Sequence, residues 1–267
     1  MTESPPTSAF GARIVAIANQ KGGVGKTTTA INLATSLALA GRRVLLVDVD
    51  PQGNLTSGIG FKSQRSDGGT VYEALLAGGP PESFVLPTRI PNLSLIPSDR
   101  NLTGAEIEMV ALPEREHRLK RLLHPLRDRF DHLFVDCPPS LGLLTLNALV
   151  AADAVLIPLH CEYFALEGLA DLVGTMRRVR GGLNPSLDIE GVLLTMYDDR
   201  TNLGQLVARD VREFFKEKVF NTIIPRNVKL GEAPSHGMPG VLYDAKSRGA
   251  AAYAALAREV LARYAAA

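Results

Sequence analysis

The chain has 267 residues, 46% of them hydrophobic, so it is long enough to bury a sizeable core. Its formal net charge of only +1 gives no strong overall preference for a polyanion. The two cysteines, Cys137 and Cys161, exclude a disulfide framework and fit a reducing cytoplasm. No segment has the roughly 18 uninterrupted apolar residues of a membrane-spanning helix.

The composition predicts one folded unit with a short tail. Residues 1–10 are rich in Pro, Ser and Thr and lack the basic and apolar regions of a signal peptide. We expect residues 1–10 to form a disordered N-terminal tail and residues 11–267 to form a single domain, because no linker interrupts the pattern that follows.

Apolar runs recur along the chain with helix-length intervals between them, which is typical of a doubly wound, mostly parallel α/β sheet flanked by helices. The expected strands are Ile14–Asn19, Val44–Asp48, Leu93–Pro97, His132–Asp136, Ala154–Leu159, Ile189–Met196 and Val219–Ile224. The expected helices are Thr27–Ala40, Val71–Ala77, a segment within Ala105–Arg129, Leu141–Ala151, Leu166–Arg180, Leu203–Lys216 and Arg248–Tyr264. Sheets of this type bind ligands at the carboxyl ends of their strands.

A glycine-rich segment, QKGGVGKTT at residues 20–28, lies between the first expected strand and the first expected helix. This context predicts a loop that binds the phosphates of a nucleotide, although Gln20 stands where the general motif has its first glycine. Backbone N–H groups at a helix N-terminus bind phosphate, and Lys26 is expected on the β- and γ-phosphates with the Thr27 hydroxyl on Mg²⁺. The predicted nucleotide-binding residues of this loop are Lys21, Gly22, Gly23, Val24, Gly25, Lys26, Thr27 and Thr28.

Three carboxylates follow apolar strands near this loop. Asp48 and Asp50 come after the second expected strand, and Asp136 ends the fourth. They would repel a nucleotide unless a metal ion or the positioning of water offsets their charge. A loop-capping role is the alternative for Asp48 and for Asp50.

Four segments together resemble one family. They are NQKGGVGKTTT at 19–29, VDVDPQGN at 47–54, VDCPPS at 135–140 and IPRNVKL at 224–230. In these motifs the chain resembles the ParA (Soj-like) chromosome and plasmid partitioning ATPases, which belong to the deviant Walker A group with MinD and the nitrogenase iron protein. The motifs extend over nearly the whole chain, so the resemblance implies a P-loop ATPase fold throughout.

The resemblance implies a role for each charged residue near the loop. Lys21 is expected to cross a dimer interface to the phosphates of the partner subunit, so Lys21, Lys26 and Asp50 are the predicted catalytic residues. Asp136 is the expected Walker B acid, Asp50 the residue that orients the attacking water, and Asp48 a support for the metal shell or the switch. The predicted metal site is therefore Thr27, Asp48 and Asp136.

The resemblance implies that residues of the C-terminal third bind the adenine base and DNA. Pro225 and Asn227 are expected to hold the base, with a simple turn role as the alternative for Asn227. Residues 177–267 carry 14 Lys and Arg against 10 Asp and Glu, so this third is mildly basic. The resemblance implies that it grips DNA phosphates, and a surface salt bridge is the alternative at each position. The candidate DNA-binding residues are Arg200, Arg226, Lys229, Lys246 and Arg248.

The predicted function is an ATP- and Mg²⁺-dependent DNA segregation ATPase. Its expected partners are a second copy of the chain in the ATP state, non-specific double-stranded DNA, and a ParB/Spo0J-type protein that stimulates hydrolysis of ATP to ADP; its expected location is the cytoplasm and nucleoid. The main alternative is a MinD-like membrane-associated regulator, although the alanine-rich C-terminal segment has few cations for a lipid surface. An iron–sulfur carrier using Cys137 and a scaffold without turnover are further alternatives; we expect Cys137 to be a buried structural thiol.

Overall fold

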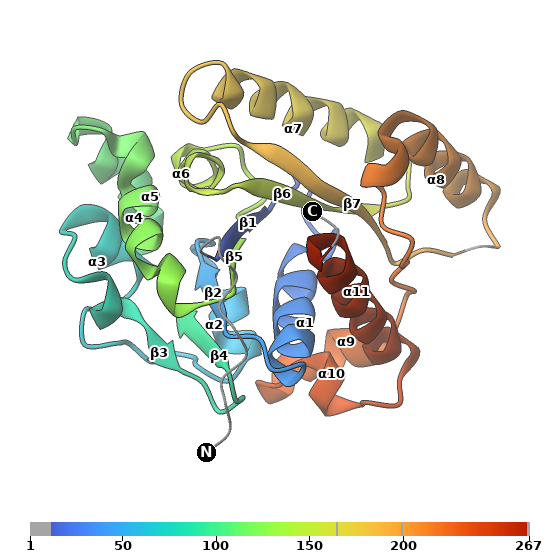
Figure 1. Cartoon of the computed structure of the whole chain (residues 1–267), viewed down its shortest axis with the longest axis horizontal. Helices are drawn as coiled ribbons and strands as arrows, with labels where there is room; N and C mark the ends of the chain where they lie inside the picture. Colours follow the sequence, from blue (N-terminus) through green and yellow to red (C-terminus); the bar gives the residue numbers. More distant parts are fainter. Residues whose placement is uncertain (1–11, 164, 199, 266–267) are drawn as a thin grey trace.

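The computed structural model describes residues 12–163, 165–198 and 200–265, and within them the strands form one seven-stranded sheet. The strand order is β3-β4-β2-β5-β1-β6-β7, and every pair is parallel except β3 with β4 (Figure 1). The strands are β1 (Arg13–Ile17), β2 (Val44–Asp48), β3 (Leu86–Pro87), β4 (Leu93–Ile96), β5 (His132–Asp136), β6 (Ala154–His160) and β7 (Asp188–Thr195). The predicted α/β fold class is confirmed.

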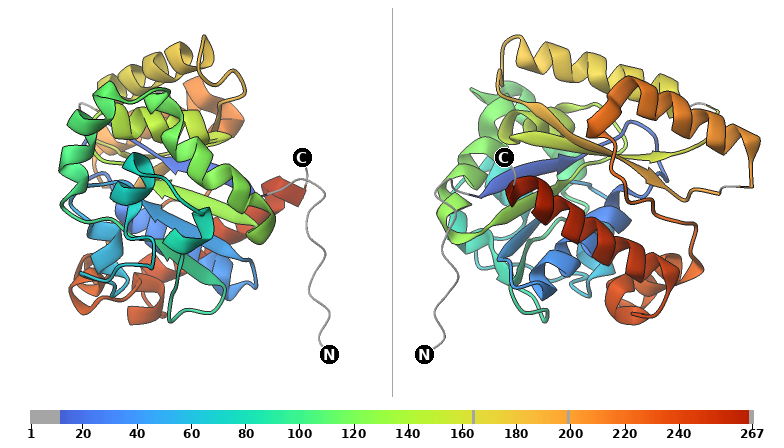
Figure 2. Two further views of the ribbon diagram at one scale, coloured as in Figure 1. Left: turned by 90° about the vertical axis from the view of Figure 1, so that its left-hand side faces the viewer. Right: turned by 45° about the vertical axis from the view of Figure 1, so that its right-hand side comes forward.

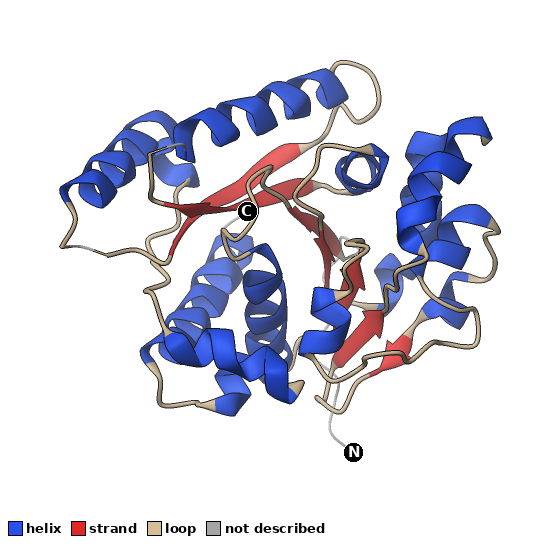
Figure 3. Ribbon diagram, turned by 180° about the vertical axis from the view of Figure 1, so that it is seen from behind, coloured by secondary structure: helices blue, strands red, loops and turns tan. Residues whose placement is uncertain are grey.

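Helices cover both faces of the sheet (Figures 1 and 3). One face packs against α3 (Val71–Leu76), α4 (Leu102–Glu108), α5 (Arg118–Leu123), α6 (Leu143–Ala151), α7 (Ala165–Arg180) and α8 (Asn202–Phe215). The other face packs against α1 (Lys26–Leu39), α2 (Asn54–Gly58), α9 (Val228–Glu232), α10 (Gly240–Tyr243) and α11 (Arg248–Ala265). Figure 2 shows α7 and α8 on the opposite side of the sheet from α11.

The central strands are apolar throughout because both of their faces are covered. In β1, Ile14 and Ala16 belong to the core on the α6 side, whereas Val15 and Ile17 belong to the core on the α1 side. All four side chains are fully buried. Continuous apolar runs therefore predicted the sheet interior well, and six of the seven expected strands are confirmed.

The expected strand Val219–Ile224 is wrong. Isolated bridges pair Val219 with Val192 of β7 and Pro225 with Tyr197, and the N–H groups of Phe220 and Ile224 donate to β7 carbonyls at 3.0 and 2.9 Å, but the residues between them form no continuous ladder. The backbone N–H groups of Asn221 and Thr222 instead donate to the carboxylate of Glu259 in α11, at 2.7 and 2.8 Å. The Glu259 carboxylate thus interrupts the pairing with β7 at Asn221 and Thr222, so no continuous ladder forms.

The other differences are also local. The expected helices are confirmed, and the segment expected within Ala105–Arg129 is α5. Pro113 and Pro125 lie on either side of α5, and 3₁₀ turns take the place of a longer helix there. The sequence reading missed β3, α2, α9 and α10, which have two to five residues each. The expected tail at residues 1–10 lies outside the described residues. None of the helices in the described ranges has the length and apolar character needed to cross a membrane.

We predict that Glu259→Gln lowers the free energy of unfolding by about 1–3 kcal/mol, because the new amide NH₂ group faces one of the two N–H donors that share the carboxylate. Burial alone raises the pKa of Glu259, but the N–H groups of Asn221 and Thr222 and the charge of Arg263 more than offset this, so its pKa is lowered. A lowered pKa in the folded state contributes stability above the unfolded pKa of about 4.3, and this contribution is lost as the pH falls through the folded value.

Urea unfolding at pH 7 and pH 4 measures this effect. The difference between the wild type and Glu259→Gln should shrink at the lower pH. The control is Glu217→Gln, which changes an exposed glutamate and should leave the stability within about 0.5 kcal/mol of the wild type. Equal losses in the two variants would contradict the prediction.

Candidate functional site

A cleft of about 730 Å³ opens at the carboxyl edge of the sheet. It is lined by loop residues 22, 23 and 25–28, by Asp50 and other residues that follow β2, by Pro139 after β5, and by the end of β7 with residues 224–227. The predicted residues Gly22, Gly23, Gly25, Lys26, Thr27, Thr28, Pro225 and Asn227 all line this cleft. The side chain of Val24 is buried beneath the loop instead.

The loop is shaped to bind an anion. Gly23 and Gly25 have φ values of 73° and 90°, which side-chain-bearing residues rarely adopt. Gly25 is also the N-cap of α1, and no side chain caps this helix end. The first N–H groups of α1 are therefore left for a ligand in the cleft.

Lys26 lies below the loop surface and is only 7% exposed. Its Nζ donates to the carbonyl oxygen of Lys21 at 3.0 Å. Burial lowers the pKa of Lys26, and the charge of Asp136 opposes this shift. A buried ammonium group held at a cleft wall is suited to a strongly anionic ligand such as a phosphate chain.

Asp136 and Thr27 form a pair beside Lys26. The Thr27 hydroxyl donates to Asp136 Oδ2 at 2.7 Å. Asp136 is fully buried, and its Oδ1 has no hydrogen-bond partner among the described residues. Burial raises the pKa of Asp136 well above its ordinary value, and the charge of Asp48 adds to this effect. A hydroxyl and a buried carboxylate oxygen without a partner fit a hydrated Mg²⁺ ion, which takes oxygen ligands and retains several waters.

Asp48 holds the loop that follows β2. Its Oδ1 accepts from the N–H of Asp50 at 3.2 Å, and its Oδ2 accepts from the N–H and hydroxyl of Thr56 at 2.9 and 2.7 Å. Burial raises the pKa of Asp48 to about 6, although the hydrogen bonds from Thr56 oppose the shift. This geometry favours the loop-capping alternative for Asp48, and its metal-supporting role stays a prediction.

Asp50 lies in the wall of the cleft and is 7% exposed. Its Oδ1 accepts from the N–H of Gln52 at 2.9 Å, and its backbone carbonyl accepts from the Ser98 hydroxyl at 2.9 Å. The first contact holds one oxygen of the carboxylate, and the second holds the backbone of Asp50. A rigid carboxylate at this place is suited to orienting a water molecule.

Lys21 has a different environment from Lys26. Its ammonium group forms an ion pair with Glu162, which lies in the loop after β6. The hydrogen bond from Lys21 lowers the pKa of Glu162. Lys21 does not line the nucleotide cleft, unlike Lys26, so the two loop lysines have different surroundings.

The base-binding and DNA-binding candidates lie near one another. Asn227 Oδ1 accepts from the N–H of Lys229 at 2.9 Å and so caps α9, which is the turn role that we considered. Arg200, Arg226 and Arg248 line a second cavity of about 860 Å³, and Arg226 also lines the nucleotide cleft.

Two of the basic candidates already have anionic partners. Arg200 makes two hydrogen bonds to the carboxylate of Asp198, at 2.8 and 2.7 Å. Lys229 pairs with Glu232 at 2.9 Å. Lys246 is exposed and, like Lys229, lies outside the lining of the second cavity. The arginine-lined cavity is therefore the part of the basic surface that the structure assembles from distant segments.

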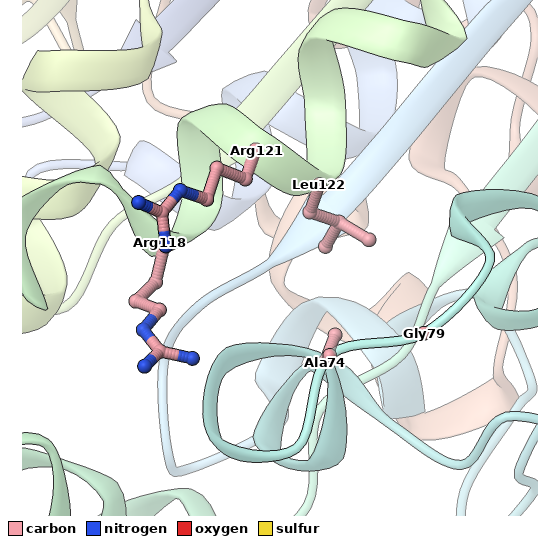
Figure 4. Close-up of a pocket in the computed structure, with 6 residues that line it drawn as sticks. Ala74, Gly79, Arg118, Arg121 and Leu122 are labelled. Atoms are coloured by element: carbon pink, nitrogen blue, oxygen red, sulfur yellow. The ribbon is translucent and has the colours of Figure 1, made fainter. Parts of the chain in front are cut away.

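A smaller cavity of about 260 Å³ lies between α3 and α5 (Figure 4). Arg118 donates to the Leu76 carbonyl at the last turn of α3, at 3.4 Å, and Arg121 pairs with Glu114. A cation at the C-terminal end of a helix satisfies carbonyl groups that lack helical partners. Both arginines thus have structural roles, and this cavity shares no lining residue with the nucleotide cleft.

The sequence analysis missed Glu162 and Thr195. Thr195 ends β7 and donates to the Val24 carbonyl at 2.8 Å. A polar residue at the carboxyl end of a predicted strand was the available signal for Thr195. Glu162 offered no such signal, because its contact with Lys21 depends on how the loop after β6 folds over the phosphate loop. Cys137 is buried, as expected, and burial raises its pKa.

Comparisons with known proteins identify similar chains. Residues 12–189 match the sequence model of the family described as AAA domain. The chain is 57% identical over 251 residues to the chromosome partitioning protein ParA of Myxococcus xanthus, covering 94% of this chain and 88% of the relative. It is 54% identical over 250 residues to the sporulation initiation inhibitor protein Soj of Bacillus subtilis, covering 94% and 98%.

Solved structures show the same fold. A Mycobacterium smegmatis protein described as cobyrinic acid a,c-diamide synthase, with bound ADP and magnesium, matches with a TM-score of 0.81 and 39% identity over 95% of each chain. The cell division ATPase MinD of Pyrococcus furiosus matches with a TM-score of 0.78 and 26% identity, over 93% of this chain and 98% of its own. From its phosphate loop, its sheet order and these relatives, the chain belongs to the ParA/Soj family of chromosome-partitioning ATPases.

Proposed function

We propose that this protein is a DNA segregation ATPase whose ATP-bound form is a dimer that binds DNA non-specifically. The observation that carries the proposal is the separation of the two loop lysines. Lys26 lines the nucleotide cleft, whereas the Lys21 ammonium lies outside it, paired with Glu162 at the surface. A lysine that does not contact the phosphates of its own protomer is available to those of a second copy.

ATP and Mg²⁺ fit the cleft described above. The loop N–H groups and Lys26 would hold the phosphates, Thr27 and Asp136 would hold the metal, and Pro225 and Asn227 would border the base. Bound Mg²⁺ supplies neutralisation of the phosphate charge. Relatives crystallised with ADP or an ATP analogue and magnesium support this assignment. Asp50 would orient the attacking water, and Lys21 of the second copy would stabilise the charge that develops on the phosphates.

An apolar surface next to Lys21 supports the dimer. Tyr163, Leu166, Leu203 and Leu206 are 75%, 39%, 42% and 44% exposed. Tyr163 directly follows Glu162, and a Cβ on Gly204, in the first turn of α8, would lie 4.0 Å from the Cys161 carbonyl, so α8 begins close to the loop that carries Glu162. Exposed apolar side chains that gather beside a functional site favour a protein–protein contact. We place the second copy on this surface.

The arginine-lined cavity supports DNA binding. Arg200, Arg226 and Arg248 come from three separate segments, and cations that gather in this way attract a phosphate backbone without reading its bases. ATP would favour the dimer, the dimer would double the basic surface, and a ParB/Spo0J-type partner would end the cycle by stimulating hydrolysis. This cycle would keep the protein in the cytoplasm and on the nucleoid.

The contacts of α11 count against the MinD-like alternative. Tyr253, Leu256, Ala257 and Val260 of this helix are buried in the core that contains α1. An amphipathic helix must expose its apolar face to insert into lipid. The apolar face of α11 is instead occupied within the domain, so we do not propose stable membrane association.

We predict that the wild type binds double-stranded DNA tightly with ATP and Mg²⁺ and much more weakly with ADP or without nucleotide. Lys21→Ala should lose the ATP-dependent binding, because the dimer loses its contact with the partner phosphates. Asp50→Ala should keep the binding and hydrolyse ATP about a hundredfold more slowly, because its water is no longer oriented. DNA mobility shifts and phosphate release measure the two effects.

The controls for this experiment are Lys62→Ala and Asp67→Ala, which remove exposed charges of the same types outside the cleft. Both should behave as the wild type. The same DNA affinity in all nucleotide states would contradict the proposed function.

We predict that Glu162→Gln strengthens ATP-dependent dimer formation by up to about fivefold. The substitution removes the charge that holds Lys21 in the separate protomer, and an exposed ion pair of this kind is worth at most about 1 kcal/mol. Sedimentation velocity with ATP over a range of protein concentrations measures the change. The control is Glu167→Gln, which alters an exposed glutamate of α7 and should have no effect. A weaker dimer in Glu162→Gln would contradict the idea that Glu162 holds Lys21 back from the second copy.

We predict that Arg248→Ala weakens DNA binding by severalfold at all sequences and lowers the salt dependence by about one unit of the logarithmic slope. Arg248 lines the arginine-lined cavity but not the nucleotide cleft, so ATP affinity should not change. Arg258→Ala removes an exposed arginine of the same helix outside both cavities and serves as the matched control. If both variants bind DNA as the wild type does, the DNA surface lies elsewhere.

A further inference from the structure

A buried hydroxyl group joins the end of β7 to the phosphate-binding loop. Thr195 is 2% exposed, and its Oγ1 donates to the backbone carbonyl of Val24 at 2.8 Å across 171 residues of sequence. The Thr195 side chain also packs on the loop, because a Cβ on Gly25 would lie 3.9 Å from the Thr195 methyl group. The contact is therefore a fixed part of the wall beneath the nucleotide cleft.

This contact sets the orientation of one peptide unit. The Val24 carbonyl and the Gly25 N–H belong to the same planar trans peptide, so the two groups point in opposite directions. Because the Val24 carbonyl points toward Thr195, the Gly25 N–H points away from Thr195. Gly25 lines the cleft, and within the part of the chain that the structure describes its N–H has no acceptor. An N–H group fixed in this way is ready for a phosphate oxygen.

The residues after Thr195 connect the same strand to the base-binding side of the cleft. Met196 lines the cleft and has a φ of 48°, a left-handed conformation that is unfavourable for a residue with a side chain. The N–H of Tyr197 then donates to the Ile224 carbonyl at 3.2 Å, directly before Pro225. Three consecutive residues thus connect the phosphate loop to the segment expected to hold the base.

We propose that Thr195 is a positioning residue for nucleotide binding: its hydroxyl orients the Val24–Gly25 peptide toward the phosphates and couples the phosphate loop to the base side of the cleft. The inference rests on the proposed function, since it assumes that the cleft binds ATP. It goes beyond the lysines and carboxylates because it assigns a role to a side chain that need not touch the nucleotide.

Thr195→Val tests the proposal, because valine keeps the shape and removes the hydroxyl. Thr195→Ser restores the hydroxyl without the methyl group. The matched control is Thr35→Val, since Thr35 is also fully buried and its hydroxyl has no hydrogen-bond partner among the described residues. Affinities for ATP, ADP and inorganic tripolyphosphate are measured by calorimetry, with kcat and KM for ATP and the thermal midpoint without nucleotide.

We expect Thr195→Val to bind ATP and tripolyphosphate about tenfold more weakly, as the loss of one well-placed buried hydrogen bond predicts. Thr195→Ser should bind both within about twofold of the wild type, and Thr35→Val should match the wild type. Tripolyphosphate has no base, so its weaker binding locates the defect in the phosphate loop. A general loss of stability would instead lower the thermal midpoint and would not be rescued by serine.

Wild-type affinity for tripolyphosphate in Thr195→Val would overturn the proposal, and so would a serine variant as weak as the valine variant. Failure of the wild type to bind ATP at all would be a different result, because it would remove the proposed function itself. Wild-type ATP binding with no effect of Thr195→Val removes only the role of Thr195.

Discussion

The site depends on charges that are buried together at the carboxyl edge of the sheet. Asp48, Asp50 and Asp136 are at most 7% exposed, and they lie beside a single buried ammonium group, that of Lys26. Burying charge is costly unless it is paired or hydrogen-bonded. Nearby backbone N–H and hydroxyl groups donate hydrogen bonds to the carboxylates of Asp48 and Asp50. Oδ1 of Asp136 has no hydrogen-bond partner among the described residues. This incomplete pairing of Asp136 favours a cation at the site, and the charge of that cation in turn favours an anionic ligand such as a phosphate chain.

The same constraint separates the two lysines of the loop. Lys26 is fixed inside the cleft by a carbonyl of its own loop, whereas Lys21 is paired at the surface with Glu162. A solvent-accessible ion pair is weak, so Lys21 can change partners at little cost. A buried ammonium group such as that of Lys26 cannot lose its partners without a large cost in free energy. One lysine therefore suits permanent phosphate binding, and the other suits a contact that forms only on assembly. Tyr163, directly after Glu162, leaves an apolar side chain exposed beside this pair.

Much of the fold and of the cleft was predictable from residues close together in the sequence. The loop at residues 20–28 combines glycines, a lysine and a threonine between a strand and a helix, and eight of the ten predicted nucleotide-binding residues line the cleft. Continuous apolar runs located six strands, because strands covered on both faces need no polar alternation. The seventh expected strand failed because Glu259, on a later helix, accepts from the N–H groups of Asn221 and Thr222 and so interrupts the pairing of this segment with β7.

By itself, the sequence determined the chemistry of the phosphate loop, the strand ends that carry the carboxylates and the α/β class, since each depends on local residue types and their spacing. Only the tertiary structure decided which groups are paired: Lys21 with Glu162, Thr195 with Val24, and Asp48 with Thr56. Pairing depends on which strands become neighbours and on how their loops pack. Residues 171 positions apart, such as Thr195 and Val24, meet only after the sheet has formed.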